Sequence, residues 1–315
     1  MCGGWKIVWL ALLLVGCQRK QAEVVPKAVP VRTDGALELK LLTLNVRYEE
    51  ERDLGERAWP RRIVEMVHLI RQQSPDVFGV QEALHGQAAD LWASLPEYTF
   101  YGVGREDGRR AGEYAGIFFR KDRFELDAAN SGIEWLSDKP EIPGTATWGN
   151  HYPRIVTWVR LIDRSSGRGF RFYNTHWDHQ KQYARERSAL FLAEKLDRRT
   201  PADEPVVVVG DFNAVETNPG IAYLTGKTVQ LVGRQRTWEN ALRDTFSARH
   251  PTEKNRRTLH FWKRGTGGTL KVDYVLVSPE AKVVRAAILS QWPGMVSDHF
   301  PVSAEVVFPG RAEIK

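Results

Sequence analysis

The 315-residue sequence contains only two cysteines, Cys2 and Cys17, and both lie close to its N-terminus. The rest of the chain has none. A disulfide framework, a zinc site built from thiolates and a cysteine nucleophile are therefore excluded for any domain that follows.

Long hydrophobic runs are also missing. The longest uninterrupted apolar segment covers residues 7–15, which is too short to span about 30 Å of hydrocarbon. A composition of 42% hydrophobic and 27% charged residues is that of a soluble globular protein and excludes a polytopic membrane protein, a coiled coil, a collagen and a disordered chain.

The formal net charge is only +6. This small excess fits an anionic substrate but does not by itself indicate nucleic acid.

The N-terminal segment, residues 1–17, has the layout of a secretory signal peptide, with Lys6 ahead of the apolar run. It ends in Leu14-Val15-Gly16-Cys17, which resembles a bacterial lipobox, in which the cysteine is lipidated and becomes the new N-terminus. Acyl chains on Cys17 would anchor the protein stably. Gln18 follows the cysteine, which favours the outer membrane in a cell with two membranes. An ordinary signal peptide is the alternative. We expect an extracytoplasmic, lipid-anchored bacterial protein.

Residues 18–36 are polar, with prolines at 26 and 30 and no apolar periodicity, and they are predicted to form a flexible tether. Residues 37–315 contain no internal repeat and no second linker, so we expect one folded domain there. Eleven Trp, thirteen Phe and nine Tyr can supply its core.

Apolar patterning within this domain predicts more strands than helices. The helices expected from a 3.6-residue period are Trp59–Arg71, with Pro60 in its first turn, His85–Leu95 and Gln182–Arg198. The expected strands are Leu37–Val46, Asp76–Gln81, Tyr98–Val103, Ala115–Phe119, Arg154–Ile162, Gly169–Asn174, Pro205–Gly210, Lys271–Val277, Ala281–Leu289 and Pro301–Val307. This order favours a layered α/β domain with mixed sheets.

Polar residues follow five of the predicted strands. Any one of them could be an ordinary turn or helix cap. Five such ends after apolar strands are better explained by a shared cleft, because neighbouring strands bring their ends together. The five segments are Asn45 to Arg47, Gln81-Glu82, Thr175 to Asp178, Asp211 to Asn213 and Ser297 to His299.

The residue types at these ends restrict the chemistry. Oxygen ligands from Glu82, Asp298 and Asn45 suit Mg²⁺ or Mn²⁺. His176 and His299 can act as acid, base or donors to a phosphoryl oxygen. The chain has no P-loop and no nucleophile elbow, so attack by water beside a metal is the plainest remaining mechanism.

Taken together, the ordered motifs resemble those of the endonuclease/exonuclease/phosphatase superfamily. They are Asn45, Gln81-Glu82, Thr175-His176, Gly210-Asp211-Phe212-Asn213 and Ser297-Asp298-His299. The resemblance covers about residues 38–308. It implies an α/β (α+β) fold, a four-layer sandwich of two mixed β-sheets packed face to face with flanking helices.

The resemblance also implies roles for individual residues. Glu82 would be the main metal ligand, supported by Asn45 and Asp298. Asp211 would orient or deprotonate the attacking water, and Asn213 would fix that water or a phosphate oxygen.

The two histidines, His176 and His299, would flank the phosphoryl group, and the resemblance does not decide which acts as base. Glu113 would pair with His176, and Asp273 would orient His299. Such pairs fix the imidazole tautomer.

Arg154 fits a phosphate clamp, although a surface ion pair is the simpler interpretation of both Arg154 and Glu113. Asp178 could line the cleft or cap the helix at Gln182–Arg198, and His260 could lie near the site. His151 and Trp148 could contact substrate, whereas His68 and His250 are expected to have no role in it. Basic residues in two loops, 105–110 and 254–264, could steer a polyanion or simply face solvent.

These observations favour a divalent-metal-dependent phosphoesterase that hydrolyses a phosphodiester or phosphomonoester outside the cytoplasm, with Mg²⁺ or Mn²⁺ as cofactor. Its partners would be a phosphate-ester substrate and, through Cys17, a membrane, and we expect a monomer. Two alternatives are a dedicated extracytoplasmic nuclease and a non-catalytic binding lipoprotein. The complete set of catalytic residue types argues against the last.

Overall fold

The computed structural model describes residues 1, 35–263 and 268–310. All but the first residue of the predicted signal peptide, including the predicted lipidation site Cys17, and nearly all of the predicted tether lie outside the described residues. Among those that are described, no helix is both long and apolar enough to cross a membrane. Everything below concerns the compact unit that the described residues from Gly35 onward form.

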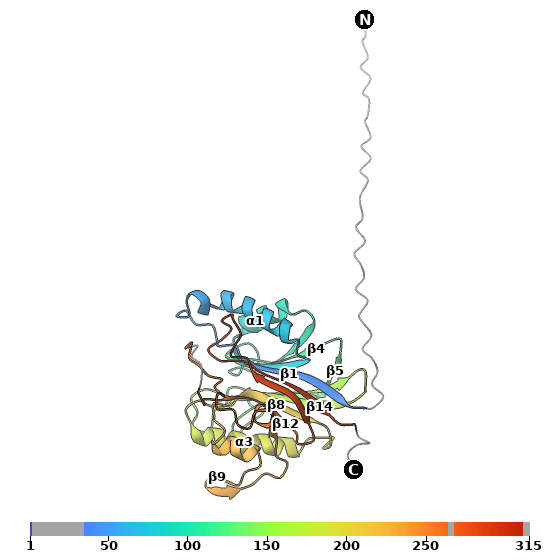
Figure 1. Ribbon diagram of the computed structural model, residues 1–315. Helices are drawn as coiled ribbons and strands as arrows, with labels where there is room; N and C mark the ends of the chain where they lie inside the picture. Colours follow the sequence, from blue (N-terminus) through green and yellow to red (C-terminus); the bar gives the residue numbers. More distant parts are fainter. Residues whose placement is uncertain (2–34, 264–267, 311–315) are drawn as a thin grey trace. The chain divides into compact units, whose positions relative to one another are not determined.

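Two six-stranded mixed sheets form the centre of this unit (Figure 1). The first has the strand order β13-β14-β1-β2-β4-β3. Its strands are β1 (Leu37–Asn45), β2 (Val77–Ala83), β3 (Tyr98–Tyr101), β4 (Tyr114–Arg120), β13 (Lys282–Ile288) and β14 (Val302–Phe308).

The second sheet has the order β11-β12-β8-β7-β6-β5. Its strands are β5 (Phe124–Trp135), β6 (Ile155–Asp163), β7 (Gly169–His176), β8 (Val206–Asp211), β11 (Arg243–Asp244) and β12 (Asp273–Val277). Two short strands, β9 (Val229–Leu231) and β10 (Arg234–Arg236), pair separately.

Helices cover the outer faces of the two sheets, and Figure 1 shows α1 over one sheet and α3 below the other. The first sheet packs against α1 (Trp59–Gln73), which η1 (Gly55–Arg57) precedes, and α2 (His85–Ser94). The second packs against α3 (Gln182–Asp197) and α4 (Pro219–Leu224), while α5 (Thr245–Arg249) contacts β13. Apolar residues of both sheets, such as Val77, Phe172 and Val302, form the inner core. The predicted four-layer sandwich is confirmed.

The predicted helices and strands are all present, with bounds that shift by up to two residues. The long strand β5 was not predicted. It lies at the edge of its sheet, most of its side chains are partly or fully exposed, and its register with β6 shifts between Asp127 and Gly132. Its sequence therefore lacks the alternation that identifies a half-buried strand.

A polar contact joins the two sheets directly beneath the strand ends. Asn174 of β7 accepts a hydrogen bond from Gln81 Nε2 at 2.7 Å and donates to the backbone oxygens of Val80 and Gly116 at 2.9 and 2.7 Å. Gly79 permits this approach, because a Cβ atom there would lie 2.6 Å from Val209 Cγ2. The spacing of the sheets is thus fixed where the predicted site begins.

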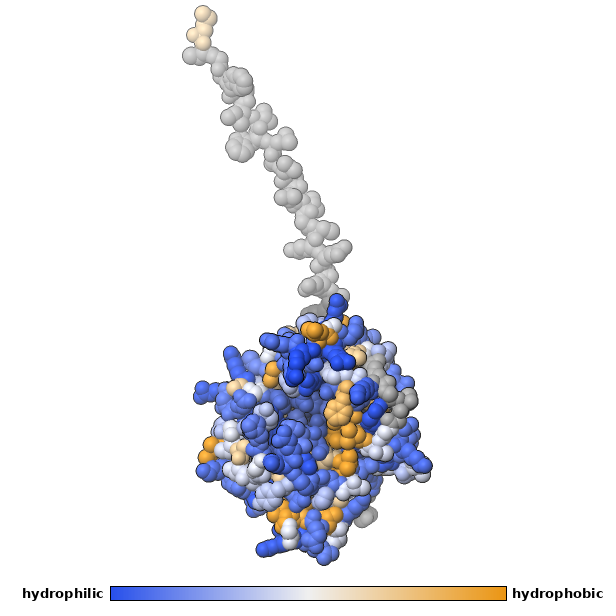
Figure 2. Space-filling view, turned by 90° about the vertical axis from the view of Figure 1, so that its left-hand side faces the viewer, coloured by the Kyte–Doolittle hydropathy of each residue, from blue (hydrophilic) through white to orange (hydrophobic). Residues whose placement is uncertain are grey.

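Pairing brings the predicted site residues to one edge. Strand β1 runs parallel to β2, with Asn45 opposite Gln81, and β7 runs parallel to β8, with His176 opposite Asp211. Asp273 lies opposite Asp211 on the antiparallel β12. Figure 2 shows the face to which these strands lead, where hydrophilic side chains fill the middle and a hydrophobic strip borders them.

Candidate active site

Asn45, at the end of β1, connects the acidic residues near the ends of β2 and β8. Its Nδ2 donates to Glu82 Oε1 at 2.9 Å and to Asp211 Oδ2 at 3.0 Å. Its Oδ1 accepts from the backbone N–H of Arg47 at 2.9 Å. Asn45 is fully buried, so these bonds hold two carboxylates from different sheets beside each other.

Local backbone distortions set the direction of two site residues. Glu82 has φ +64° and stands at a bulge between Gln81 and Ala83. Asn213 has φ +47°. A positive φ is uncommon for residues other than glycine and is often found at functional sites. Here it turns Glu82 out of the alternation of β2, so that Tyr48 N–H donates to Glu82 Oε2 at 3.2 Å.

Asp211 lies at the centre of the cluster, between the two histidines. Its Oδ2 is 3.7 Å from His176 Nε2 and 3.8 Å from His299 Nε2. Its Oδ1 accepts from the backbone N–H of Asn213 at 2.8 Å. Burial, followed by repulsion from Asp273, raises the pKa of Asp211. A higher pKa makes this carboxylate a stronger base.

His299 is held by Asp273, whose Oδ2 lies 2.9 Å from His299 Nδ1. Burial would lower the pKa of His299, but the carboxylates of Asp273, Asp211 and Asp298 outweigh it and raise that pKa to about 10. The imidazole is therefore protonated near neutral pH. Its Nε2–H faces the centre of the site and can donate.

His176 has the opposite character. Burial, followed by the positive charge of Arg154, lowers the pKa of His176 to about 3. Its Nδ1 is 3.5 Å from Glu113 Oε2 and makes no hydrogen bond. Glu113 is instead held by Arg105, through bonds of 2.5 and 2.9 Å. The predicted Glu113–His176 pair is thus in contact, while the stronger partner of Glu113 is Arg105.

Arg154 precedes β6 and is only 4% exposed. One of its terminal nitrogens, Nη2, bonds His179 Nδ1 at 2.9 Å, and its Nε is 3.8 Å from Asp178 Oδ2. Both Nε and Nη1 are buried without a hydrogen-bond acceptor. An unsatisfied buried donor costs about 1–3 kcal/mol, and more when it is charged. An anion in the site would remove that cost.

The ligand atoms of Glu82, Asp211 and His299 all lie within 4.8 Å of one another, which makes this group a possible metal site. Carboxylate oxygens are the ligands that hard divalent ions prefer. Burial raises the pKa of Asp298, the third predicted carboxylate, and a bound cation would lower that pKa again. The donor set therefore fits a hard divalent ion.

The structure thus gathers the predicted residues at one edge of the sandwich, and it adds two that sequence reasoning missed. Arg105 is 5% exposed. It therefore neither faces solvent nor steers a polyanion, which were the two interpretations of the basic residues in its loop. His179 contacts Arg154. His179 could have been predicted from its position, because it directly follows the polar segment Thr175 to Asp178 at the end of β7.

The remaining predicted contacts can now be placed. Asp178 Oδ1 accepts from the backbone N–H groups of Gln180 and Lys181 at 2.9 and 2.6 Å, so it orders the turn before α3 and also faces Arg154. His260 is buried against Phe300, with ring centroids 4.2 Å apart.

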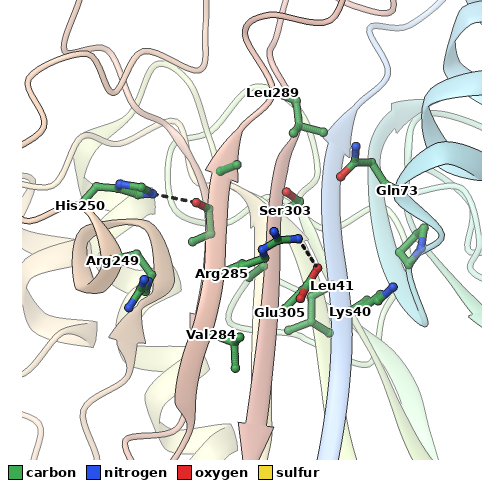
Figure 3. Close-up of a pocket in the computed structure, with 14 residues that line it drawn as sticks. Lys40, Leu41, Gln73, Arg249, His250, Val284, Arg285, Leu289, Ser303 and Glu305 are labelled. Atoms are coloured by element: carbon green, nitrogen blue, oxygen red, sulfur yellow. Dashed lines mark hydrogen bonds and ion pairs between the residues drawn. The ribbon is translucent and has the colours of Figure 1, made fainter.

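The two histidines expected to have no role in the site lie elsewhere. His68 contacts Trp292. His250 Nε2 bonds the backbone oxygen of Ala286 at 2.8 Å beside a cavity of about 310 Å³ (Figure 3). That cavity lies over β1, β13 and β14 and is lined by none of the predicted site residues.

Comparison with known proteins identifies the arrangement. A model of the Endonuclease/Exonuclease/phosphatase family matches residues 42–299. The chain belongs to this family. Its members are phosphoester hydrolases that depend on a divalent metal, and the carboxylate cluster described above is the possible site for that metal here.

Two structures from Bacteroides and one viral protein are among those similar to this chain. An endonuclease/exonuclease/phosphatase from Bacteroides vulgatus is 30% identical with a TM-score of 0.74, covering 86% of this chain and 98% of that one. A mannosyl-6-phosphatase from Bacteroides thetaiotaomicron is 29% identical with a TM-score of 0.73, covering 86% and 100%. An uncharacterized protein of Acanthamoeba polyphaga mimivirus is 26% identical over 165 residues, and the match covers 49% of this chain and 59% of that protein's length.

Proposed function

We propose that the protein hydrolyses a phosphate ester by attack of water, with Mg²⁺ or Mn²⁺ bound, on the extracytoplasmic side of a bacterial membrane to which Cys17 anchors it. One observation carries the chemical part of this proposal. Buried Asp211 lies within 4 Å of both histidines, while Arg154 offers two N–H donors without acceptors.

Asp211 is the base in this proposal. Its carboxylate is fixed by Asn45 and by the backbone of Asn213, so it can hold a water molecule in one orientation. Because burial raises its pKa, the carboxylate accepts a proton from that water more readily than an exposed aspartate would.

Arg154 and His299 are the donors to the phosphoryl group. Two N–H groups of Arg154 can bond phosphate oxygens, and a guanidinium matches this geometry better than an ammonium group. Protonated His299 stabilises negative charge or donates its Nε2 proton to the leaving oxygen. His176 is a neutral imidazole near neutral pH and therefore a poor acid, so of the two histidines we assign the acid role to His299.

The metal would be held by Glu82, with Asn45 and Asp298 beside it, which leaves the Asp211 carboxylate available as the base. When bound, it supplies positive charge that stabilises the phosphoryl oxygens as negative charge develops. Asn213 Nδ2 donates to the backbone oxygen of Trp177 at 3.0 Å, which fixes the amide next to the base.

The name of the mannosyl-6-phosphatase relative supports a phosphate monoester as substrate. The test is a panel of a hexose phosphate, bis-(p-nitrophenyl) phosphate, single-stranded DNA and RNA, assayed with Mg²⁺, with Mn²⁺ and with chelator. We expect metal-dependent release of phosphate from a monoester. Cleavage of nucleic acid alone, at a rate that falls steeply with salt, would instead identify a nuclease. If no ester is hydrolysed, the non-catalytic binding lipoprotein is the alternative that remains.

A further inference from the structure

Three exposed rings lie together beside the buried Arg154. Tyr152 is 42% exposed, and its ring centroid lies 4.6 Å from that of His151, edge-on, and 6.5 Å from that of His179, nearly parallel. His151 and His179 are exposed as well. We call His151, Tyr152 and His179 the ring cluster.

The ring cluster contacts the catalytic residues from outside at two points. His179 Nδ1 is bonded to Arg154 at 2.9 Å. The Arg105 guanidinium lies 5.3 Å from the centre of the Tyr152 ring, and Arg105 holds Glu113 next to His176. A group joined to a phosphate that Arg154 binds would therefore leave the site past these rings.

The His179 imidazole is neutral in this arrangement. Its Nδ1 accepts a hydrogen bond from the Arg154 guanidinium, which carries no acceptor. Desolvation, followed by the charge of Arg154, lowers the pKa of His179. Its Nε2 then carries the proton, so the ring presents a neutral hydrogen-bond donor to the outside.

The loop that carries Tyr152 is fixed by its own hydrogen bonds. Asn150 Nδ2 donates to the backbone oxygen of Tyr152 at 2.7 Å, and Asn150 Oδ1 accepts from Trp148 N–H at 3.3 Å. Trp148 is buried, and its indole donates to Asp138 at 2.9 Å. Gly149, with φ +79°, makes the turn. An exposed tyrosine on an ordered loop can serve as a preorganised platform.

We propose that the ring cluster binds the alcohol portion of the substrate and that this portion is a carbohydrate ring, so that the protein acts on phosphorylated sugars. This rests on the proposed phosphoesterase function. One face of a sugar ring is made of C–H groups that pack on an aromatic face, while its hydroxyls need neutral donors and acceptors at the edge. Tyr152 supplies the face and the two imidazoles supply the edge.

A polynucleotide fits this surface less well. Binding of a single strand uses successive aromatic platforms together with cations that follow the phosphates. The ring cluster offers one tyrosine, and Arg105, the cation next to that tyrosine, is already paired with Glu113. Room for one ring next to one phosphate is what a sugar phosphate requires.

The experiment compares Tyr152→Ala and Tyr152→Phe with the full-length protein on three monoesters: a hexose 6-phosphate, glycerol 3-phosphate and a nucleoside 5′-monophosphate. We expect Tyr152→Ala to lower kcat/KM for the hexose phosphate about 10-fold, mainly through KM. Tyr152→Phe keeps the aromatic face and retains most of the activity. Glycerol 3-phosphate has hydroxyls but no ring, so its rate changes less than about twofold.

The matched control is Tyr183→Ala on α3, which removes a tyrosine of similar exposure, 47%, and should change none of the three rates. Equal losses on hexose and glycerol phosphates, no loss on either, or a larger loss on the nucleotide would each overturn the proposal. The proposal would also be overturned if the wild-type protein cleaved bis-(p-nitrophenyl) phosphate but no hexose phosphate. That result would leave the proposed phosphoesterase function standing. If the wild type cleaves no ester at all, the proposed function itself is wrong.

Discussion

Replacing Asp273 by asparagine removes the main charge that keeps His299 protonated. Asp273 Oδ2 lies 2.9 Å from His299 Nδ1 and is the first of the carboxylates that raise the pKa of His299 to about 10. Asparagine has nearly the same shape but no charge. The substitution therefore tests whether a proton on His299, and not merely the orientation of its ring, is needed for hydrolysis.

The expected magnitude follows from the two pKa values of His299. At pH 8 a group with a pKa of about 10 is about 99% protonated, whereas one with the ordinary value of 6.5 is about 3% protonated. At pH 6 the two differ by less than about twofold. A variant in which the pKa of His299 returns to its ordinary value should therefore lose about 25-fold in kcat/KM between pH 6 and pH 8 relative to the wild type.

The assay is phosphate release from a monoester as a function of pH, at saturating Mg²⁺, for wild type and Asp273→Asn. In the wild type we expect kcat/KM to fall on the acid side as Asp211 takes up a proton and on the alkaline side as His299 loses one. Taking the ratio between pH 8 and pH 6 removes any loss that does not depend on pH. An NMR titration of the His299 ring checks the pKa directly.

A wild-type alkaline limb that does not move in Asp273→Asn would refute this reasoning, because the proton on His299 would then not depend on Asp273. A stability measurement gives a second check. Since the folded-state pKa of His299 is raised, the stability that its protonation contributes is fully present below pH 6.5 and is lost as the pH rises through about 10. The difference in unfolding free energy between the two proteins should shrink over that interval.

Three further predictions concern the clamp, the sandwich and the anchor. Arg154→Lys should lower kcat/KM about 10-fold or more, because an ammonium group cannot replace two N–H donors of a planar fork; unchanged steady-state kinetics would exclude Arg154 from phosphate binding. Gly79→Ala should destabilise the fold by about 1–3 kcal/mol, since its Cβ would lie 2.6 Å from Val209 Cγ2; urea unfolding measures this, and a neutral result would mean that the sheets can separate. Cys17→Ser should release the protein from membranes on fractionation, and continued tight membrane retention would contradict the lipid anchor.

The fold was largely predictable because its inner strands are apolar and short. Two strands, Val206–Asp211 and Asp273–Val277, are fully buried, and their sequences are almost continuous apolar runs. Edge strand β5 was missed because an exposed strand needs no apolar pattern. The short elements after α4, such as β9 and β10, carry too few residues for any period to be visible.

The candidate site was predictable where a motif follows a strand end. Asp211, Asn213 and His299 fall at such positions, and the structure brings them together. Arg105 and His179 were missed for a physical reason. Arg105 is buried by pairing with Glu113 eight residues away, where the loop between them folds back. The role of His179 depends on its contact with Arg154, 25 residues earlier in the chain.

Local sequence also gave no measure of proton affinity. His176 and His299 look equivalent in sequence, yet the structure gives them pKa values of about 3 and about 10. The difference arises because Arg154 lies near one imidazole and three carboxylates lie near the other. Only the packing of the two sheets establishes which charges are neighbours.

The most direct test of the central claim is phosphate release by the wild type and by Asp211→Asn, each with Mg²⁺, with Mn²⁺ and with chelator. Hydrolysis by the wild type should depend on the metal, and kcat should fall at least about 100-fold in the variant, which should remain folded by circular dichroism. A folded Asp211→Asn protein with wild-type kcat would contradict the assignment of Asp211 as the base and, with it, the proposed mechanism.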